Sequence, residues 1–402
     1  MSANMFADAA LTERLDQFQI RALVVGAIGL VVGLAAYVMG PVHFFPAYLV
    51  GYLFWLGISL GCVGLTMLHH LVGGSWGLVI RRPLESGAMN VLLLAVLFVP
   101  LAFGVHSLYP WARAGSAAAH ESGIEHSAYL TESFFLIRAC LYFVVWIAMA
   151  LILNGLSNRQ DANSDPAPSR WLQALSGPGI VLLFLAGTFS AIDWGMSLDP
   201  KWTSTIYGVM LIIGDALATM ALMIAVGSLL ATNEPMSEVA TPGRLNDLGN
   251  LLLAFVMLWA YMSFCQFLII WSGNLTEEIP WYVRRTRGGW QWVALALILF
   301  HFFLPFLVLL FRENKRKTTI ISRVALWILF MHWVDLVWLV VPASTDPASP
   351  RILWIEVLLS AVMTVGVGGI WIAFYIHWLK RRPLVPLYDP NLIEALKHAG
   401  GH

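Results

Sequence analysis

Apolar residues gather along the chain into ten long stretches, each bounded by charged residues or by turns rich in proline and glycine. Each stretch supplies the ~20 residues that an α-helix needs to cross a bilayer. Because backbone polar groups must be hydrogen-bonded internally in lipid, such spans form helices. The pattern predicts an all-α polytopic membrane protein with ten transmembrane helices near residues 20–39, 46–72, 88–109, 131–154, 172–193, 203–230, 246–271, 290–311, 320–341 and 352–379.

The loops between the spans are short. The sequence therefore predicts one integral membrane domain over residues 1–402. Spans two to five, residues 46–193, are expected to form one four-helix bundle. Spans six to nine, residues 199–342, form a second, and the first and tenth helices lie at the periphery. Asp199 followed by Pro200 favours an N-cap with proline at the first helical position, which predicts that the sixth helix begins there.

Composition agrees with a membrane protein, since 59% of residues are apolar and only 11% are charged. Soluble domains have about 45–50% apolar and about 25% charged residues. Lys plus Arg and Asp plus Glu are equal at 23 each, and no basic tract is interleaved with aromatics. A nucleic-acid partner is therefore not expected.

The cysteines give no sign of a metal or haem site. Cys62, Cys140 and Cys265 each lie in a different apolar stretch, and none has a second thiol or a histidine at ligand spacing. No CxxCH motif is present for covalent haem, and no cysteine cluster for iron and sulfur. The chain is expected to bind no metal, so any electron carrier is a diffusible molecule or belongs to a partner.

Lysine and arginine predict the orientation. Most of them fall at the N-terminus, in the even-numbered loops and at the C-terminus, including Arg81, Arg82 and Lys397. By the positive-inside rule, both termini are cytoplasmic. The exceptions include Arg351 and a basic, aromatic seventh loop on the outer side. That loop is either a lipid-headgroup anchor or a docking surface for a partner, carried by Trp281, Tyr282, Arg284, Arg285 and Arg287.

Four ionisable residues are predicted near the outer side, namely Glu132, Arg138, Asp193 and Glu356. A charge at the centre of a membrane helix costs at least ~2.5 kcal/mol, so each one needs a partner or a role. Arg138 lies about two turns inside and must face a carboxylate or water; either Asp193 or Glu356 could be its partner. The set is either a structural ion pair or a polar pocket through which protons leave.

A second group lies at mid-depth and consists of Asp215, His301, His332 and Asp335. His332 and Asp335 are three residues apart, hence on one helical face and able to share a proton. Pro305 deprives the carbonyl of His301 of its helical donor, so the helix should kink there and leave room for water. This group favours a proton path.

At the inner side, His69 and His70 close the second span and His377 stands near the end of the tenth. Adjacent helical residues point about 100° apart, so we expect that His69 and His70 do not line one cavity. The complete hypothetical route enters at one of these histidines and passes the mid-depth group. It leaves near Glu132, Asp193 or Glu356.

Haem is the competing interpretation, because His301 and His332 lie at similar depth on neighbouring helices. Cytochrome-b bundles, however, repeat histidines within one helix, and that pattern is absent from the sequence. The 18 Trp and 22 Phe could stack on a quinone ring, but aromatic residues also fill helix bundles and interfacial belts. No catalytic residue that makes or breaks bonds is evident.

Three stretches of sequence resemble a known family. They are YLFWLGISLGCVGLTMLHHLVGGSWGLVIRR at residues 52–82, GTFSAIDWGMSLDPKWTSTIYG at 187–208 and QFLIIWSGNLTEEIPWYVRRTRGGW at 266–290. Together with the ten spans, they are similar to the F subunit of alternative complex III, a bacterial quinol:cytochrome c oxidoreductase. That subunit belongs to the NrfD-like, or polysulfide reductase membrane-subunit, superfamily.

The resemblance implies a non-catalytic or quinone-interacting subunit in the bacterial inner membrane. Its partners would be a second NrfD-like membrane subunit, an iron-sulfur and molybdopterin-like subunit, c-type cytochrome subunits, lipids and a terminal oxidase. Quinol, menaquinol or a similar one, would be oxidised near the outer face. Electrons would pass to iron-sulfur clusters and haem c on the partners, then to cytochrome c or a HiPIP. Within that complex, the F subunit resembles a proton-conducting subunit. The second NrfD-like subunit is the better candidate for the site of quinol oxidation.

Two other classes stay open. An ion-coupled secondary transporter would use the same buried polar residues, but such proteins usually break helices at matching positions of two halves. Here Pro100 and Pro305 lie in spans three and eight, which do not correspond. A structural membrane anchor of a redox complex would use the buried charges only to hold helices and partners together.

Overall fold

The computed structural model describes residues 6, 8–113, 129–162, 164–344, 352, 354–389 and 392. Arg351 and Lys397 lie outside this part of the chain. So does most of the loop between the third and fourth spans, residues 110–130. The described residues form helices without a strand, and ten segments are long and apolar enough to cross a membrane. The protein is an all-α polytopic membrane protein, as the hydrophobic pattern predicts.

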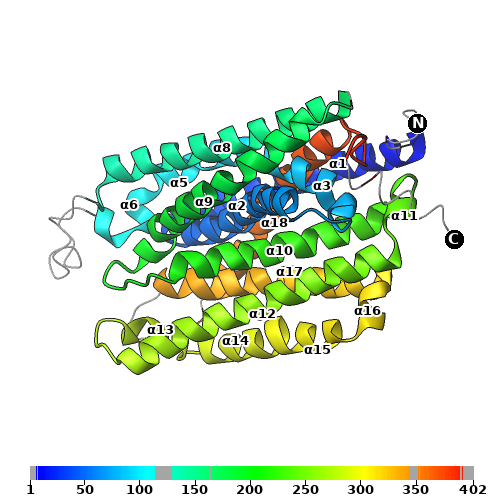
Figure 1. Ribbon diagram of the computed structural model, residues 1–402. Helices are drawn as coiled ribbons and strands as arrows, with labels where there is room; N and C mark the ends of the chain where they lie inside the picture. Colours follow the sequence, from blue (N-terminus) through cyan, green and yellow to red (C-terminus); the bar gives the residue numbers. More distant parts are fainter. Residues whose placement is uncertain are drawn as a thin grey trace.

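The helices run side by side (Figure 1). The long ones are α1 (Ala9–Met39), α2 (Pro41–Val72), α8 (Glu132–Ala162), α9 (Ala167–Trp194), α10 (Tyr207–Leu230), α12 (Pro242–Gly273), α17 (Thr318–Val340) and α18 (Trp354–Leu379). The third span comprises α3 (Gly77–Met89), α4 (Val91–Leu97) and α5 (Val99–Phe103), followed by α6 (Val105–Leu108). The eighth comprises α14 (Trp290–Ala296), the π-helix η4 (Leu297–Phe303) and α15 (Leu304–Leu310).

Short helices lie at the ends of these spans. They are η1 (Pro110–Ala112), η3 (Met196–Leu198), α11 (Met236–Val239), α13 (Ile279–Arg285), α16 (Arg312–Arg316) and η5 (Val341–Ser344). We name the face where α1 begins and α18 ends the terminal face, and the other the opposite face. The first turns of α1, with α3 and α11, lie at the terminal face, whereas α6 and α13 lie at the opposite face (Figure 1).

Two boundaries differ from the predicted ones in ways that matter. The third span begins at Gly77 and not near residue 88, because α3 is buried along its whole length despite its charges. The sixth helix begins at Tyr207, so the prediction that Asp199 caps it is wrong. Asp199 instead follows the short helix η3, and its N–H donates to the Met196 carbonyl.

Glycines set the closest helix contacts. A Cβ at Gly26 or Gly29 of α1 would lie 2.7 Å from the backbone of α18, so these two helices pack backbone to backbone. Helix α18 also packs along α2 and α3, whereas α10 contacts α2, α9, α12 and α17. Because α10 joins helices of both halves, the division at 46–193 and 199–342 stays a prediction.

Candidate functional site

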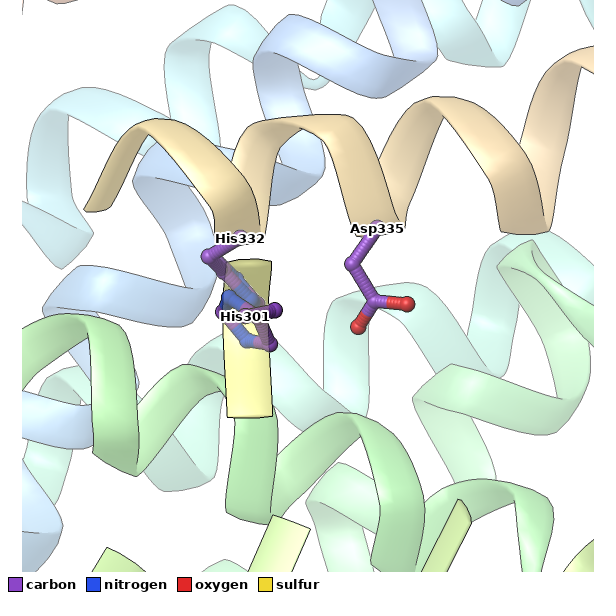
Figure 2. Close-up of side chains that lie close together, drawn as sticks. All are labelled: His301, His332 and Asp335. Carbon is purple, nitrogen blue, oxygen red and sulfur yellow. The ribbon is translucent and has the colours of Figure 1, made fainter. Parts of the chain in front are cut away.

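Three helices bring the mid-depth ionisable residues together. Helix α17 contributes His332 and Asp335, η4 contributes His301, and α10 contributes Asp215. One ligand atom from each of His301, His332 and Asp335 lies within 4.8 Å of those of the other two, and all three side chains are buried. Figure 2 shows the two imidazole rings close together and Asp335 one turn along α17. We call Asp215, His301, His332 and Asp335 the central cluster.

Within the described residues, the members of the central cluster form no direct hydrogen bond with one another. The indole N–H of Trp259 on α12 donates to Asp335 Oδ2 at 3.0 Å, and the same indole meets the His301 ring edge-on at 4.3 Å between centroids. Asp215 Oδ1 lies 3.6 Å from His332 Nε2, too far for a direct hydrogen bond. Among the described residues, no ring nitrogen of His301 or His332 has a hydrogen-bond partner. Buried polar atoms of this kind indicate a place for water, a proton or an ion.

Small residues make room for the central cluster. A Cβ at Gly57 of α2 would lie 2.0 Å from Asp215 Oδ1, so this carboxyl occupies space that only glycine leaves free. A Cβ at Gly214 would lie 3.1 Å from His332 Cε1. Sequence reasoning missed Gly57, Gly214 and Trp259, because their role depends on which helix faces which.

The helix irregularity predicted around His301 takes the form of a π-helix. Pro305 follows the wide turn of η4 and has no N–H to donate. The Phe300 carbonyl, whose π-helical donor would also be Pro305, instead accepts the indole N–H of Trp327 at 2.8 Å. Widened turns of this type are frequent at functional sites.

Two largely apolar cavities reach the central cluster from different sides. One of about 220 Å³ lies between α2, α9 and α10 and has Asp215 in its wall. The other, of about 640 Å³, lies between α12, α13, η4 and α17 and has Asp335 and Trp259 in its wall. Its remaining lining is mostly aromatic and aliphatic, including Phe264, Phe302 and Trp338. The central cluster therefore stands between two separate cavities.

The predicted inner histidines do not form one group. His69 and His70 both line a cavity of about 220 Å³ at the terminal face, so the expectation that they would face different spaces is wrong. The cavity wraps the last turn of α2, where residues on different sides of the helix reach the same space. His377 lies half-buried on α18 against Trp378 and is not in this wall.

A buried charge network lies beside this cavity, and sequence reasoning missed it by placing Arg81 and Arg82 in a loop. Glu85 receives hydrogen bonds from Arg81 at 2.9 Å, Arg82 at 2.5 Å and Ser157 at 2.6 Å. Among the described residues, ion pairs join three arginines and three acids from α3, α8 and the segment after α18: Arg81, Arg82, Arg382, Glu85, Asp161 and Asp389. The pairing of opposite charges explains how so many ions are buried in one place.

The four predicted outer residues lie in three separate contacts. Arg138 pairs with Asp193 through two hydrogen bonds of 2.8 Å, and Tyr142 donates to the same carboxylate at 2.8 Å. Glu356 instead contacts His43 at 2.9 Å and Ser344 at 2.7 Å. Glu132 is exposed and lies 3.2 Å from His106. Of the two partners considered for Arg138, the structure therefore shows Asp193.

This geometry predicts that Arg138 and Asp193 act on stability as one unit. Asp193→Leu should lower the free energy of unfolding by about 3–5 kcal/mol, because it leaves a buried guanidinium unpaired. The double variant Arg138→Leu/Asp193→Leu should recover most of that loss, since neither charge remains. Unfolding in detergent, followed by tryptophan fluorescence, measures both variants. Equal losses in the single and double variants would contradict a structural ion pair.

The predicted docking loop is mostly turned inward. Trp281 is buried and stacks on Trp202 at 4.5 Å, and the Arg285 guanidinium lies 3.7 Å from the Trp281 ring. Burial lowers the pKa of Arg285 to about 9, while the carbonyls of Trp281, Trp338 and Leu339 accept its hydrogen bonds. Both side chains hold α13 against the end of α17 and are not available for docking.

The other members of the loop differ in exposure. Arg284 pairs with Asp199 at 3.2 Å, and Tyr282 is half-buried in the wall of the 640 Å³ cavity. Arg287 is exposed. The docking hypothesis therefore rests on Arg287 and not on the five residues together.

Comparison with known proteins adds no assignment, because no model of a known family and no curated protein matches this chain. The functional interpretation consequently depends on the residues and contacts of the chain itself.

Proposed function

We propose that this protein is the proton-carrying membrane subunit of a bacterial respiratory quinol-oxidising complex. The observation that carries the proposal is the central cluster, which lies between two cavities. It contains two carboxyls and two buried imidazoles whose ring nitrogens have no hydrogen-bond partner within the described residues. Carboxyl and imidazole groups can each accept and release a proton. Ionisable residues at membrane depth are costly and mark ion or proton pathways in many membrane proteins.

The respiratory assignment is supported by the three stretches that resemble the alternative complex III subunit. In space they contact one another: Ser204 of the second donates to Gln266 of the third at 2.5 Å, and Trp202 stacks on Trp281. Tyr52 of the first stretch meets Trp194 of the second at 6.3 Å between ring centroids. Stretches that are distant in sequence but packed together act as one unit of structure, which is expected if the resemblance reflects a shared fold.

Coupling requires two states of the central cluster, since a continuous wire would only let protons leak. The contact between Asp215 and His332, at 3.6 Å, could switch between these two states, because a small shift of α10 against α17 would make or break a hydrogen bond there. In this proposal, both termini are cytoplasmic and the terminal face takes up protons. Replacement of Asp335 by asparagine should then abolish proton translocation, as measured in proteoliposomes.

Quinol binding in the 640 Å³ cavity is a second candidate, favoured by its aromatic lining and by Asp335 in its wall. Oxidation of a quinol there would release two electrons and two protons. Asp335 would accept one of these protons, and water at the opposite face, where α13 lines the cavity, would accept the other. Haem or iron-sulfur groups on partner subunits would accept the electrons.

Purification through a tag on this chain tests membership of such a complex. We expect c-type haem in the reduced-minus-oxidised spectrum, together with a second NrfD-like subunit and an iron-sulfur, molybdopterin-like subunit. The measurement is the spectrum and the identity of the copurifying proteins after mild detergent extraction. A colourless protein that purifies alone would instead support the transporter class.

A further inference from the structure

The central cluster also has the composition of a metal site. Two imidazoles and one carboxylate, from His301, His332 and Asp335, present ligand atoms within 4.8 Å of one another. Nitrogen and oxygen ligands of this kind bind zinc and other divalent first-row transition metals. Two of the three come from one helical turn of α17, and the third comes from the π-helix that faces it (Figure 2).

The ligand atoms are free to coordinate. Each imidazole must offer one nitrogen, and within the described chain none of the four nitrogens is engaged in a hydrogen bond. Asp335 uses Oδ2 to accept the Trp259 N–H, a contact typical of the outer partners that orient a metal-bound carboxylate. Asp215 stands at the border of the site, where its Oδ1 lies 3.6 Å from His332 Nε2, and it is not one of the three mutually close ligand groups.

Charge balance favours an ion of charge +2. Asp335 is buried and Asp215 is half-buried among apolar helices. Two ionised carboxylates in such a place are strongly disfavoured unless positive charge accompanies them. A divalent cation bound by Asp335 and two neutral imidazoles, with Asp215 beside them, makes a site of zero net charge. Arginine or lysine does not supply this charge within the described residues, where the ion-pair contact of these two carboxylates is that of Asp215 with His332.

We propose that the central cluster binds one divalent first-row transition-metal ion, with Zn²⁺ as the simplest case. Both cavities that reach it are largely apolar, so an ion would enter as the helices assemble and exchange slowly afterwards. If the proposed proton path is also correct, the ion-filled and proton-carrying forms are alternative states of the same residues. Zn²⁺ would then block proton transfer.

Metal content of the full chain, purified with its partners where they copurify, tests the proposal. Cells grown with added Co²⁺ or Zn²⁺ should yield about one bound ion per chain by mass spectrometry of the metals. Cobalt should show the visible absorption of a four- or five-coordinate site. His332→Gln and Asp335→Asn should each lose the ion, whereas His377→Gln, a control on α18, should retain it.

A measurement on the unaltered protein guards against variants that do not fold. X-ray absorption of the Co²⁺- or Zn²⁺-loaded protein should show the scattering of imidazole ligands. Protein without bound metal, metal retained by both cluster variants, or a spectrum without imidazole scattering would overturn the proposal. Because metal content is read without proton transport, failure here is distinct from failure of the proton path.

Discussion

Glu85→Ala is expected to prevent most of the chain from accumulating in folded form. Glu85 is buried and contacts three arginines, with Arg382 at 3.6 Å in addition to Arg81 and Arg82. Its removal takes away the one carboxylate that all three guanidiniums contact within the described residues, so buried positive charge loses its partner. Breaking a buried ion pair costs about 3–5 kcal/mol, and a typical protein is stable by only about 5–15 kcal/mol.

The yield of monodisperse protein in size-exclusion chromatography and its thermal midpoint measure this effect. Glu132→Ala is the matched control, because that carboxylate is exposed at the opposite face and should leave both quantities near wild type. Arg82→Met/Glu85→Leu removes one charge of each sign, so it should recover part of the loss. Wild-type yield and midpoint for Glu85→Ala would refute the role of the network.

The hydrophobic pattern was sufficient for the fold class, because lipid imposes one requirement on every span. The helix boundaries predicted from this pattern are wrong where charged side chains are buried in ion pairs. Arg81, Arg82 and Glu85 appear in sequence as the end of a loop, yet each neutralises a neighbour three or four residues away and α3 starts before them. No rule of local hydropathy detects ion pairs whose other members, such as Asp389, are far along the chain.

The sequence predicted how deep in the membrane the residues of the candidate site lie, but not in which direction their side chains face. Asp215, His301, His332 and Asp335 were expected at similar depth, and they do lie together because α10, η4 and α17 turn these faces toward one another. Depth alone also suggested Arg285 as a surface residue. It is buried because its guanidinium donates hydrogen bonds to two carbonyls in the last turn of α17, and these contacts depend on tertiary packing. His377 shows the converse, since its helix pairs with α1 and α2 away from the central cluster.

Asp335→Asn is expected to remove proton translocation while leaving the assembled complex intact. Asparagine has nearly the shape of aspartate, and its amide oxygen can still accept the Trp259 N–H that now bonds Asp335 at 3.0 Å. The cost in stability should therefore stay near 1 kcal/mol or below, the usual net value of one hydrogen bond. The amide, however, cannot bind and release a proton near neutral pH, so the step between His332 and the 640 Å³ cavity is lost.

Proteoliposomes with a pH-sensitive dye measure the protons moved per electron, and the copurifying haem reports assembly. We expect at least a tenfold loss of translocation, equivalent to about 1.4 kcal/mol in the limiting barrier. Asp215→Asn should behave similarly, and the double variant should be no worse than either single one, since both groups act in series along one path. Glu132→Gln, which changes an exposed carboxyl outside the central cluster, should pump as wild type does. Assembled Asp335→Asn complex with the wild-type proton-to-electron ratio would exclude the central cluster from the path and favour a purely structural role for its charges.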